Sequence, residues 1–175
     1  MAGPAERDIA NPAVGWRYWQ LGGDGLLYSV SWRRFVWKPG QPLQAFCFEP
    51  HPPPAPDCSC GVYANAELAQ LREHGLCLGP AGLVVGRVGL WGRVVVDDHG
   101  GLRGQRAYPA QLALVPETVE AASVPGALAH LRAYRVPVSA MALDEAVGPM
   151  SRALIANQAM SQQASRAHGD EPAAP

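Results

Sequence analysis

The chain has 175 residues, of which 48% are hydrophobic and 17% are charged. This length suits one folded domain, and so much apolar content excludes a chain that is disordered throughout. Its 14 basic and 15 acidic residues nearly balance, which excludes a generally basic nucleic-acid coat and a polyanionic tail. The composition therefore predicts a globular domain, with 19 Gly and 17 Pro residues that require many turns and loops.

The expected compartment follows from two patterns that the sequence lacks. No apolar run approaches the roughly 20 residues that cross a bilayer, and residues 1–8 contain no apolar core of a secretory signal. We therefore expect a cytoplasmic location and no membrane partner. In a reducing cytoplasm the four cysteines are expected to be thiols or metal ligands rather than disulfides.

The first part of the chain predicts strands after a flexible start. Residues 1–15 are small, polar and Pro-containing, which is typical of a flexible lead-in. Residues 26–37 are rich in aromatic and β-branched side chains with partial alternation, which predicts one half-buried strand. Residues 43–48 predict a second, shorter strand that ends before Pro50.

The middle of the chain predicts a loop, a short helix and a long hairpin. Residues 50–61 contain five prolines, which remove backbone donors and fix φ, so this segment is expected to be irregular. Residues 66–74 suit a short helix. Residues 83–96 show the strongest strand pattern, and a turn-forming segment separates them from a return strand at 102–114. Glycines in the first strand indicate a bulge or a close backbone approach, and Pro109 places the return strand at an edge or a bend.

The last third predicts helices. Residues 126–134 carry leucines at helical spacing after a proline in a first-turn position. Ser139 is expected to cap a helix that follows it, which Pro149 would kink or divide. We expect an α+β fold, with a β-rich antiparallel sheet or small barrel and helices in the C-terminal third. A single domain at 16–157 would then be followed by a polar, disordered tail at 158–175.

The clearest polar pattern is a group of Cys and His residues in and after the Pro-rich loop. Zinc takes four such ligands tetrahedrally, and a short paired spacing allows one turn to supply two of them. Two pairs, C-x-C and H-x-x-C, are separated by thirteen residues, and Cys47 or a loop histidine could replace a member of the second pair. The candidate zinc ligands are Cys58, Cys60, His51, His74 and Cys77.

Two other interpretations of these residues remain open. The cysteines could be small buried hydrophobic residues, with the histidines on the surface. Alternatively, His51 could activate Cys58 or Cys60 as a nucleophile, or three ligands and an open position could hold a zinc-activated water. No recognised catalytic signature supports either form of enzyme, so the sequence leaves enzymatic activity undecided.

The hairpin carries a second candidate site, a binding surface. Basic and aromatic side chains on its strands could stack on bases or grip phosphates, as nucleic-acid-binding β-barrels do. The candidate residues are Trp91, Arg93, Arg103, Arg106 and Tyr108. Against this interpretation, aromatic residues on strands are usually core residues, arginines alternate to solvent, and the chain is not basic. Nucleic acid is thus an alternative partner and not the favoured one.

Three stretches together resemble a known family. A C-x-C-G-(I/V)-Y-A motif at residues 58–64 precedes a G-x-V-x-L-W-G-x-V strand at 86–94 and an A-Y-P at 107–109. This combination resembles a family of small actinobacterial and actinophage proteins for which no activity is established. The resemblance covers residues 16–138 and implies a common fold without implying an activity. The second pair of candidate ligands is not part of the family pattern, so the shared polar cluster would be His51, Cys58 and Cys60.

Together these patterns favour a non-enzymatic cytoplasmic binding or adaptor domain whose Pro-rich loop holds a structural zinc. Its partner would be a protein or a small molecule. One alternative is a small Cys- or zinc-dependent enzyme that uses His51, Cys58 and Cys60. The other is a nucleic-acid-binding β-barrel that uses the hairpin.

Overall fold

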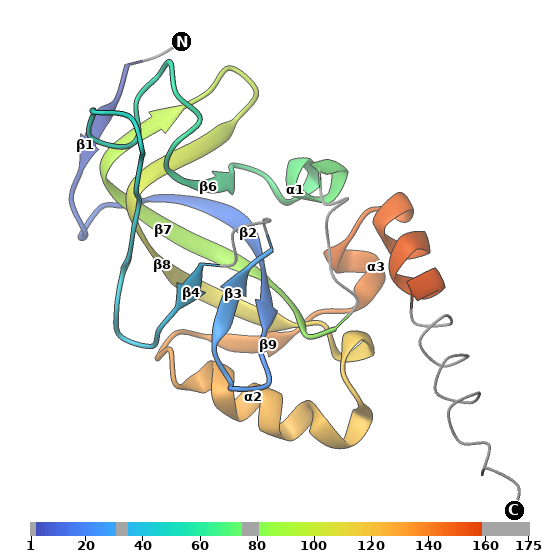
Figure 1. The fold of residues 1–175 in the computed structure, drawn as a ribbon. Coiled ribbons are helices and arrows are strands. Elements are labelled where there is room, and N and C mark those ends of the chain that lie inside the picture. Colours follow the sequence, from blue (N-terminus) through green and yellow to red (C-terminus); the bar gives the residue numbers. More distant parts are fainter. Residues whose placement is uncertain (1–2, 31–34, 75–80, 159–175) are drawn as a thin grey trace, which may run out of the picture.

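The computed structural model describes residues 3–30, 35–74 and 81–158, whose arrangement is shown in Figure 1. The strands among these residues form one mainly antiparallel sheet of nine strands. Helices lie beside the sheet in the C-terminal part of the chain. The expected α+β class is therefore confirmed.

The longest element is a hairpin of β7 (Leu83–Val96) and β8 (Gly101–Leu114), as the sequence predicts. Strand β7 is rich in valine, and β8 places leucine and alanine at many of its buried positions, which suits a pleated, buried surface. In the turn between them, the Asp97 carboxylate accepts hydrogen bonds from the backbone N–H groups of His99 (3.0 Å) and Gly101 (2.7 Å). This side-chain bonding to nearby backbone groups fixes the reversal of the chain.

Two further strands join the hairpin in a closed circuit of pairings. Strand β2 (Ala13–Leu21) pairs antiparallel with β7, and β6 (Val62–Asn65) pairs antiparallel with β8. One residue pair, Trp16 with Asn65, joins β2 to β6. This closed circuit corresponds to the small-barrel form of the expected fold.

Short strands extend the sheet from these four. On the far side of β2, the sheet continues with β3 (Leu27–Ser29), which pairs with β2, and then with β4 (Val36–Trp37), which pairs with β3. Strand β1 (Ala5–Arg7) pairs with β7. Strands β5 (Leu43–Gln44) and β9 (Val138–Ala140) pair with β8, and β9 is parallel to it.

Three strand predictions are corrected by these pairings. The expected lead-in at 1–15 contains β1 and the start of β2, because backbone pairing with β7 orders a stretch of low hydrophobicity. Residues 26–37 contain two antiparallel strands and not one, with Tyr28 opposite Val36. Residues 43–48 are a strand only at β5, whereas the Pro-rich segment at 50–61 lacks helix and strand, as predicted.

The helices before residue 135 lie where the sequence predicts them. Helix α1 comprises Leu68–His74, and helix α2 comprises Val124–Arg132 with a proline in its first turn. Two short 3-10 helices, η1 (Pro116–Thr118) and η2 (Ala121–Ser123), connect β8 to α2. Within the described part of the chain, no helix combines the length and the hydropathy that crossing a membrane requires.

The predicted start of the helix after Ser139 is wrong. Ser139 lies in β9 opposite Ala113 of β8, so its backbone groups belong to the sheet. Helix α3 begins later, at Leu143–Ala146, and another helix runs over residues 149–158, so Pro149 does divide the helical stretch. The rest of the expected tail, residues 159–175, lies outside the described residues.

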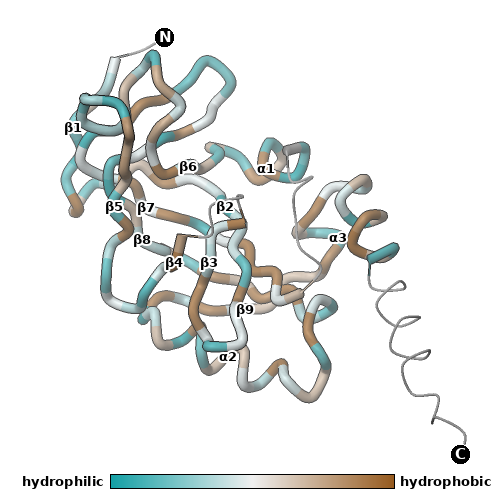
Figure 2. Tube along the Cα trace, in the orientation of Figure 1, coloured by the Kyte–Doolittle hydropathy of each residue, from teal (hydrophilic) through white to brown (hydrophobic). Residues whose placement is uncertain are grey.

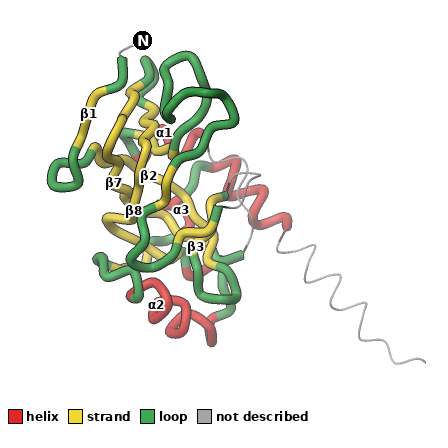
Figure 3. The backbone as a smooth tube through the Cα atoms, turned by 60° about the vertical axis from the view of Figure 1, so that its left-hand side comes forward, coloured by secondary structure: helices red, strands yellow, loops and turns green. Residues whose placement is uncertain are grey.

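One of two core clusters lies between the sheet and α2, and the other contains residues of β2, β7, β8, α1 and α3. Trp19 of β2 and Trp37 of β4 are buried and pack edge to face, with ring centroids 5.5 Å apart. Tyr134, just after α2, donates a hydrogen bond to the carbonyl of Trp37 (2.5 Å) and accepts one from the N–H of Leu27 (2.8 Å). Figure 2 shows hydrophobic residues along the strands and hydrophilic ones at the turns, and Figure 3 shows α2 at one end of the sheet.

Bulges bend the long hairpin at two places. The register between β7 and β8 shifts between Arg87 and Val88 and again between Trp91 and Val94. Pro109 lies opposite Val88, so it occupies a bend, which is one of its two predicted positions. Next to the first shift, a Cβ on Gly86 would lie 2.0 Å from the carbonyl oxygen of Gln111. The two backbones approach so closely there that only glycine fits.

We expect Gly86→Ala to lower the free energy of unfolding by about 1–3 kcal/mol, because the new methyl group would overlap the backbone of β8. Gly23→Ala is the matched control, since no atom lies within 4 Å of a Cβ at that position. Urea unfolding of both variants, followed by tryptophan fluorescence, measures the difference. Equal stabilities would contradict the close approach of the two strands.

Candidate metal centre and the adjoining cleft

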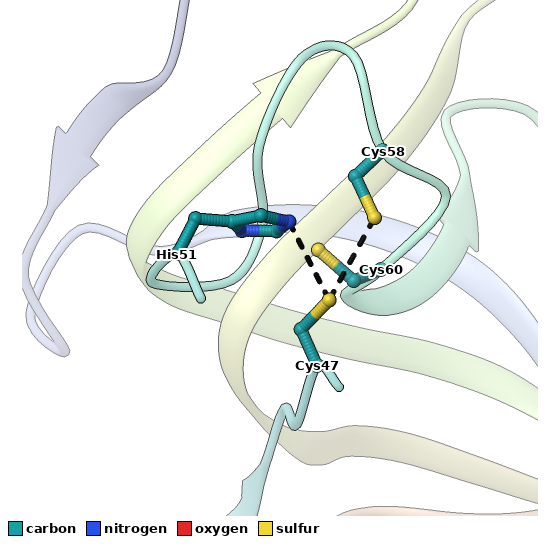
Figure 4. A group of neighbouring side chains, drawn as sticks. All are labelled: Cys47, His51, Cys58 and Cys60. Carbon is teal, nitrogen blue, oxygen red and sulfur yellow. Dashed lines mark hydrogen bonds between the residues drawn. The ribbon is translucent and has the colours of Figure 1, made fainter. Parts of the chain in front are cut away.

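Four side chains in and just before the Pro-rich loop converge on one point (Figure 4). Cys47 precedes the loop, His51 lies near its start, and Cys58 and Cys60 lie near its end. One ligand atom of each residue lies within 4.8 Å of those of all the others. The four residues, which we call the Cys3His cluster, are therefore close enough to bind a metal ion.

The two strands that flank the loop explain why these residues meet. Before the loop, Leu43 in β5 pairs with Ala107 of β8, and the N–H of Ala45 donates to the carbonyl of Gln105 (2.8 Å). After the loop, Val62 in β6 pairs with Gly104 of β8. Both ends of the segment are thus held at neighbouring positions of one strand, so the chain between them must fold back on itself.

The distances within the Cys3His cluster match a tetrahedral site. The Sγ atoms of Cys47 and Cys58 are 3.7 Å apart, and Cys47 Sγ lies 3.5 Å from Nε2 of His51. Around zinc, with Zn–S of about 2.3 Å and Zn–N of about 2.0–2.1 Å, tetrahedral angles place two sulfurs about 3.8 Å apart and a sulfur and nitrogen about 3.6 Å apart. These two pairs of ligand atoms are therefore spaced as zinc ligands would be, and all the others lie within 4.8 Å of one another.

The ligand atoms are chemically free to bind. All three cysteines of the cluster are thiols, and the 3.7 Å between Cys47 and Cys58 far exceeds the roughly 2.05 Å of a disulfide. Nδ1 of His51 lies 3.4 Å from the carbonyl oxygen of Pro52, which can only accept a hydrogen bond. A neutral imidazole with its proton on Nδ1 can donate to this carbonyl, which leaves the lone pair of Nε2 for a metal.

The buried guanidinium of Arg103 holds the loop in this shape. Arg103 belongs to β8, and only 6% of its surface is exposed. A proline-rich backbone offers carbonyl acceptors but few N–H donors, so a side chain that only donates is a suitable partner for it. The guanidinium donates hydrogen bonds to the carbonyl oxygens of Ala55 (3.0 Å), Pro56 (3.3 Å), Cys58 and Cys60 (3.1 Å).

The chain leaves the cluster through Gly61, which directly follows Cys60. Its φ is 123°, a conformation that residues with a side chain rarely adopt. A Cβ at this position would also lie 3.0 Å from the Cβ of Arg103. Two residues later, the Tyr63 hydroxyl donates a hydrogen bond to the carbonyl of Ser59, which connects β6 to the loop.

The cluster shifts the titration of its own groups. A hydrogen bond from the backbone N–H of Cys60, followed by one from the His51 imidazole, lowers the pKa of Cys58 to about 7. The same contact with Cys58 raises the pKa of His51, and burial raises the pKa of the Cys60 thiol. A Cys58 thiolate is therefore well populated at neutral pH, as metal binding or nucleophilic attack requires.

The Cys3His cluster borders a cleft of about 810 Å³. Its three cysteines form part of the wall, and residues of β2, β3, β5 and β6 form much of the rest. Phe46 and Phe48, on either side of Cys47, are 64% and 74% exposed and contact each other edge to face at 5.0 Å. Large apolar side chains exposed together beside a cleft are typical of an interaction site.

Three of the five predicted ligands lie in the Cys3His cluster, namely His51, Cys58 and Cys60. The fourth member is Cys47, which the sequence offered only as a replacement. Cys47 is not part of a short-spaced Cys pair, so the sequence pattern did not single it out. The feature that identifies it is the pairing of both β5 and β6 with β8. The predicted pair His74 and Cys77 stays untested, because the His74 side chain and the whole of Cys77 lie outside the described residues.

The predicted binding surface on the hairpin is not one continuous surface. Trp91 and Arg103 are only 7% and 6% exposed, so both belong to the interior and neither is free to stack on a base or grip a phosphate. Arg93 and Tyr108 are half-buried, and Arg106 is exposed. The sequence placed Arg103 on a strand but could not show that this side of the strand is covered by the Pro-rich loop.

Comparisons with known proteins identify no relative: no protein-family model, curated protein or solved structure matches the chain. The resemblance to the actinobacterial and actinophage family therefore stays a prediction. The cluster and the cleft themselves are therefore the features that indicate a function.

We expect Arg103→Lys to weaken zinc binding roughly 10- to 100-fold, the range found when residues that orient metal ligands are replaced. Lysine keeps the positive charge but lacks the planar fork that reaches several carbonyls at once. Arg106→Lys, an exposed change on the same strand, is the matched control. Competition with a chromophoric zinc chelator gives both affinities, and equal values would contradict the orienting role of Arg103.

The metal-free protein should show two different thiol titrations. Because its pKa is lowered to about 7, alkylation of Cys58 by iodoacetamide should reach half its maximal rate near pH 7. Cys60, whose pKa is raised by burial, should reach half its maximal rate above the ordinary value of about 8.5. Mass spectrometry of peptides after timed alkylation separates the two, and a shared midpoint would contradict the described contacts.

Proposed function

We propose that this protein is a zinc-organised, non-enzymatic binding domain with a reducing, cytoplasmic location. Cys47, His51, Cys58 and Cys60 hold one zinc ion, which fixes the Pro-rich loop as a wall of the cleft. The observation that carries the proposal is the convergence of all four ligand atoms within 4.8 Å of one another. Four protein ligands, all nitrogen or sulfur, are typical of structural zinc sites, whereas catalytic sites use three and keep one position open.

The charges around the cluster support a bound metal. Three thiolates and a neutral imidazole around a divalent ion leave one net negative charge. Arg103, which donates to the carbonyls of Cys58 and Cys60, places one positive charge beside it. The metal cluster and the buried arginine therefore compensate each other electrostatically.

A thiol-dependent enzyme is the second candidate, because Cys58 lines the cleft and its pKa is lowered to about 7. His51 would then act as the base that keeps Cys58 ionised. This reading needs an uncoordinated thiol, and it leaves the approach of Cys47 and Cys60 without a role. The metal reading uses all four side chains and is favoured for that reason.

The test is metal analysis of protein purified without chelator. We expect about one zinc ion per chain, and we expect Cys47→Ser to abolish zinc retention because it removes one of the four ligands. Cys77→Ser is the matched control, since the four ligands are complete without it, and it should retain the zinc. A chelator should also lower the thermal midpoint of the unmodified chain, because zinc binds only the folded state tightly.

The outcomes separate the readings. Loss of zinc in Cys77→Ser with retention in Cys47→Ser would overturn the ligand set proposed here. Zinc-free protein with a fast-reacting Cys58 thiol would instead favour cysteine chemistry. Zinc-free protein with slow, protected thiols would remove both readings of the cluster.

A further inference from the structure

Arg17 of β2 lines the same cleft and has an unusual environment for a cation. One of its terminal nitrogens donates to the carbonyl of Tyr63, and the other donates to Oγ of Ser29 (2.9 Å). The guanidinium carbon lies 5.2 Å from the centre of the Trp37 ring. Its Nε is shielded from solvent and has no hydrogen-bond partner among the described residues.

Among the described residues, these contacts leave the charge of Arg17 without an anion. A guanidinium has five N–H donors, and its two hydrogen bonds in the described structure go to uncharged oxygens. Burial is the cause that lowers the pKa of Arg17, to about 10, with no contribution from an acidic neighbour, so the side chain stays a cation at neutral pH. A half-buried cation that no carboxylate among the described residues neutralises costs stability, and such groups are characteristic of binding sites.

The rest of the cleft is suited to an apolar molecule. Its volume of about 810 Å³ lies within the range of roughly 300–1,000 Å³ typical of small-molecule sites. Phe35, Phe46 and Phe48 line it and are 44%, 64% and 74% exposed, so they offer apolar surface that a ligand could cover. A cation among aromatic side chains selects for a molecule with one anionic group and an apolar body.

We propose that the cleft binds a small monocarboxylic acid, whose carboxylate pairs with Arg17 and whose apolar body lies against Phe46 and Phe48. A singly charged acid fits better than a phosphate dianion, because the cleft is also lined by the Glu49 carboxylate and by the cysteines of the cluster. This inference assigns a ligand class to the proposed binding domain. It rests on the proposed function because the zinc-bound loop forms one wall of the cleft.

The test uses isothermal titration of the zinc-loaded chain with 4-phenylbutyrate and with its uncharged analogue, 4-phenylbutyramide. We expect the acid to bind roughly tenfold or more tightly than the amide, as a charge-assisted hydrogen bond to a shielded cation implies. Arg17→Gln should abolish this preference. Arg87→Gln, which removes an exposed arginine from the adjacent strand β7, is the matched control and should keep it.

Equal affinities for acid and amide in the unmodified chain, or no binding of either, would overturn the proposal without recourse to a variant. Retention of the acid preference in Arg17→Gln would overturn the role of Arg17. Zinc content is measured on the same samples, so the two proposals fail separately. Zinc without acid binding removes the ligand class alone, whereas acid binding by a naturally zinc-free chain removes the metal alone.

Discussion

The shape of the Pro-rich loop depends on hydrogen bonds that its own backbone cannot make. Prolines lack an N–H group, so the loop presents carbonyl oxygens without matching donors. Arg103 meets this need, because a guanidinium has several donors in one plane and no acceptor. By binding carbonyls on both sides of Cys58, it holds an otherwise irregular segment in one conformation. The geometry of the candidate metal centre therefore depends on a buried cation from the sheet.

Strand β8 connects the fold to the site. It pairs with β7 along its length and, on its other side, with β6, β5 and β9 in turn. Because β5 and β6 take neighbouring positions on it, the intervening loop is closed at its base. Because the two ends of the loop are already held together, less conformational entropy is lost when its side chains converge or bind an ion. The sheet therefore prepares the cluster before any metal is bound.

Two arginines of the sheet differ in whether a candidate negative charge lies beside them. Arg103 lies under the cluster, where its charge is adjacent to cysteine ligands and its donors are used by the loop. Arg17 lies in the wall of the cleft, where its partners are a carbonyl and a hydroxyl. A metal centre with one net negative charge would compensate the first arginine, whereas no anion among the described residues compensates the second. This difference is why the cleft, and not the cluster, points to a ligand.

Where local pattern decides the structure, the sequence was sufficient. The two strands of the long hairpin, β7 and β8, the irregular Pro-rich segment, α1 and α2 were all predictable, because propensity, turn residues and proline chemistry act over a few residues. Three members of the cluster could be named for the same reason, since two of them are a C-x-C pair within the loop. The division of residues 26–37 into β3 and β4 was missed, because the whole stretch has the composition of a strand.

Only the tertiary structure decided which distant segments contact one another. Cys47 became the fourth cluster member because β5 and β6 pair side by side on β8, and Ser139 entered a strand because β8 offered it a partner. Arg103 was predicted to face solvent, and it is buried because the loop folds over that side of the sheet. The sequence by itself determined the residue types, the local elements and the chemistry available. Pairing and burial depend on neighbours far apart in the chain, so only the folded sheet decided which of these groups meet.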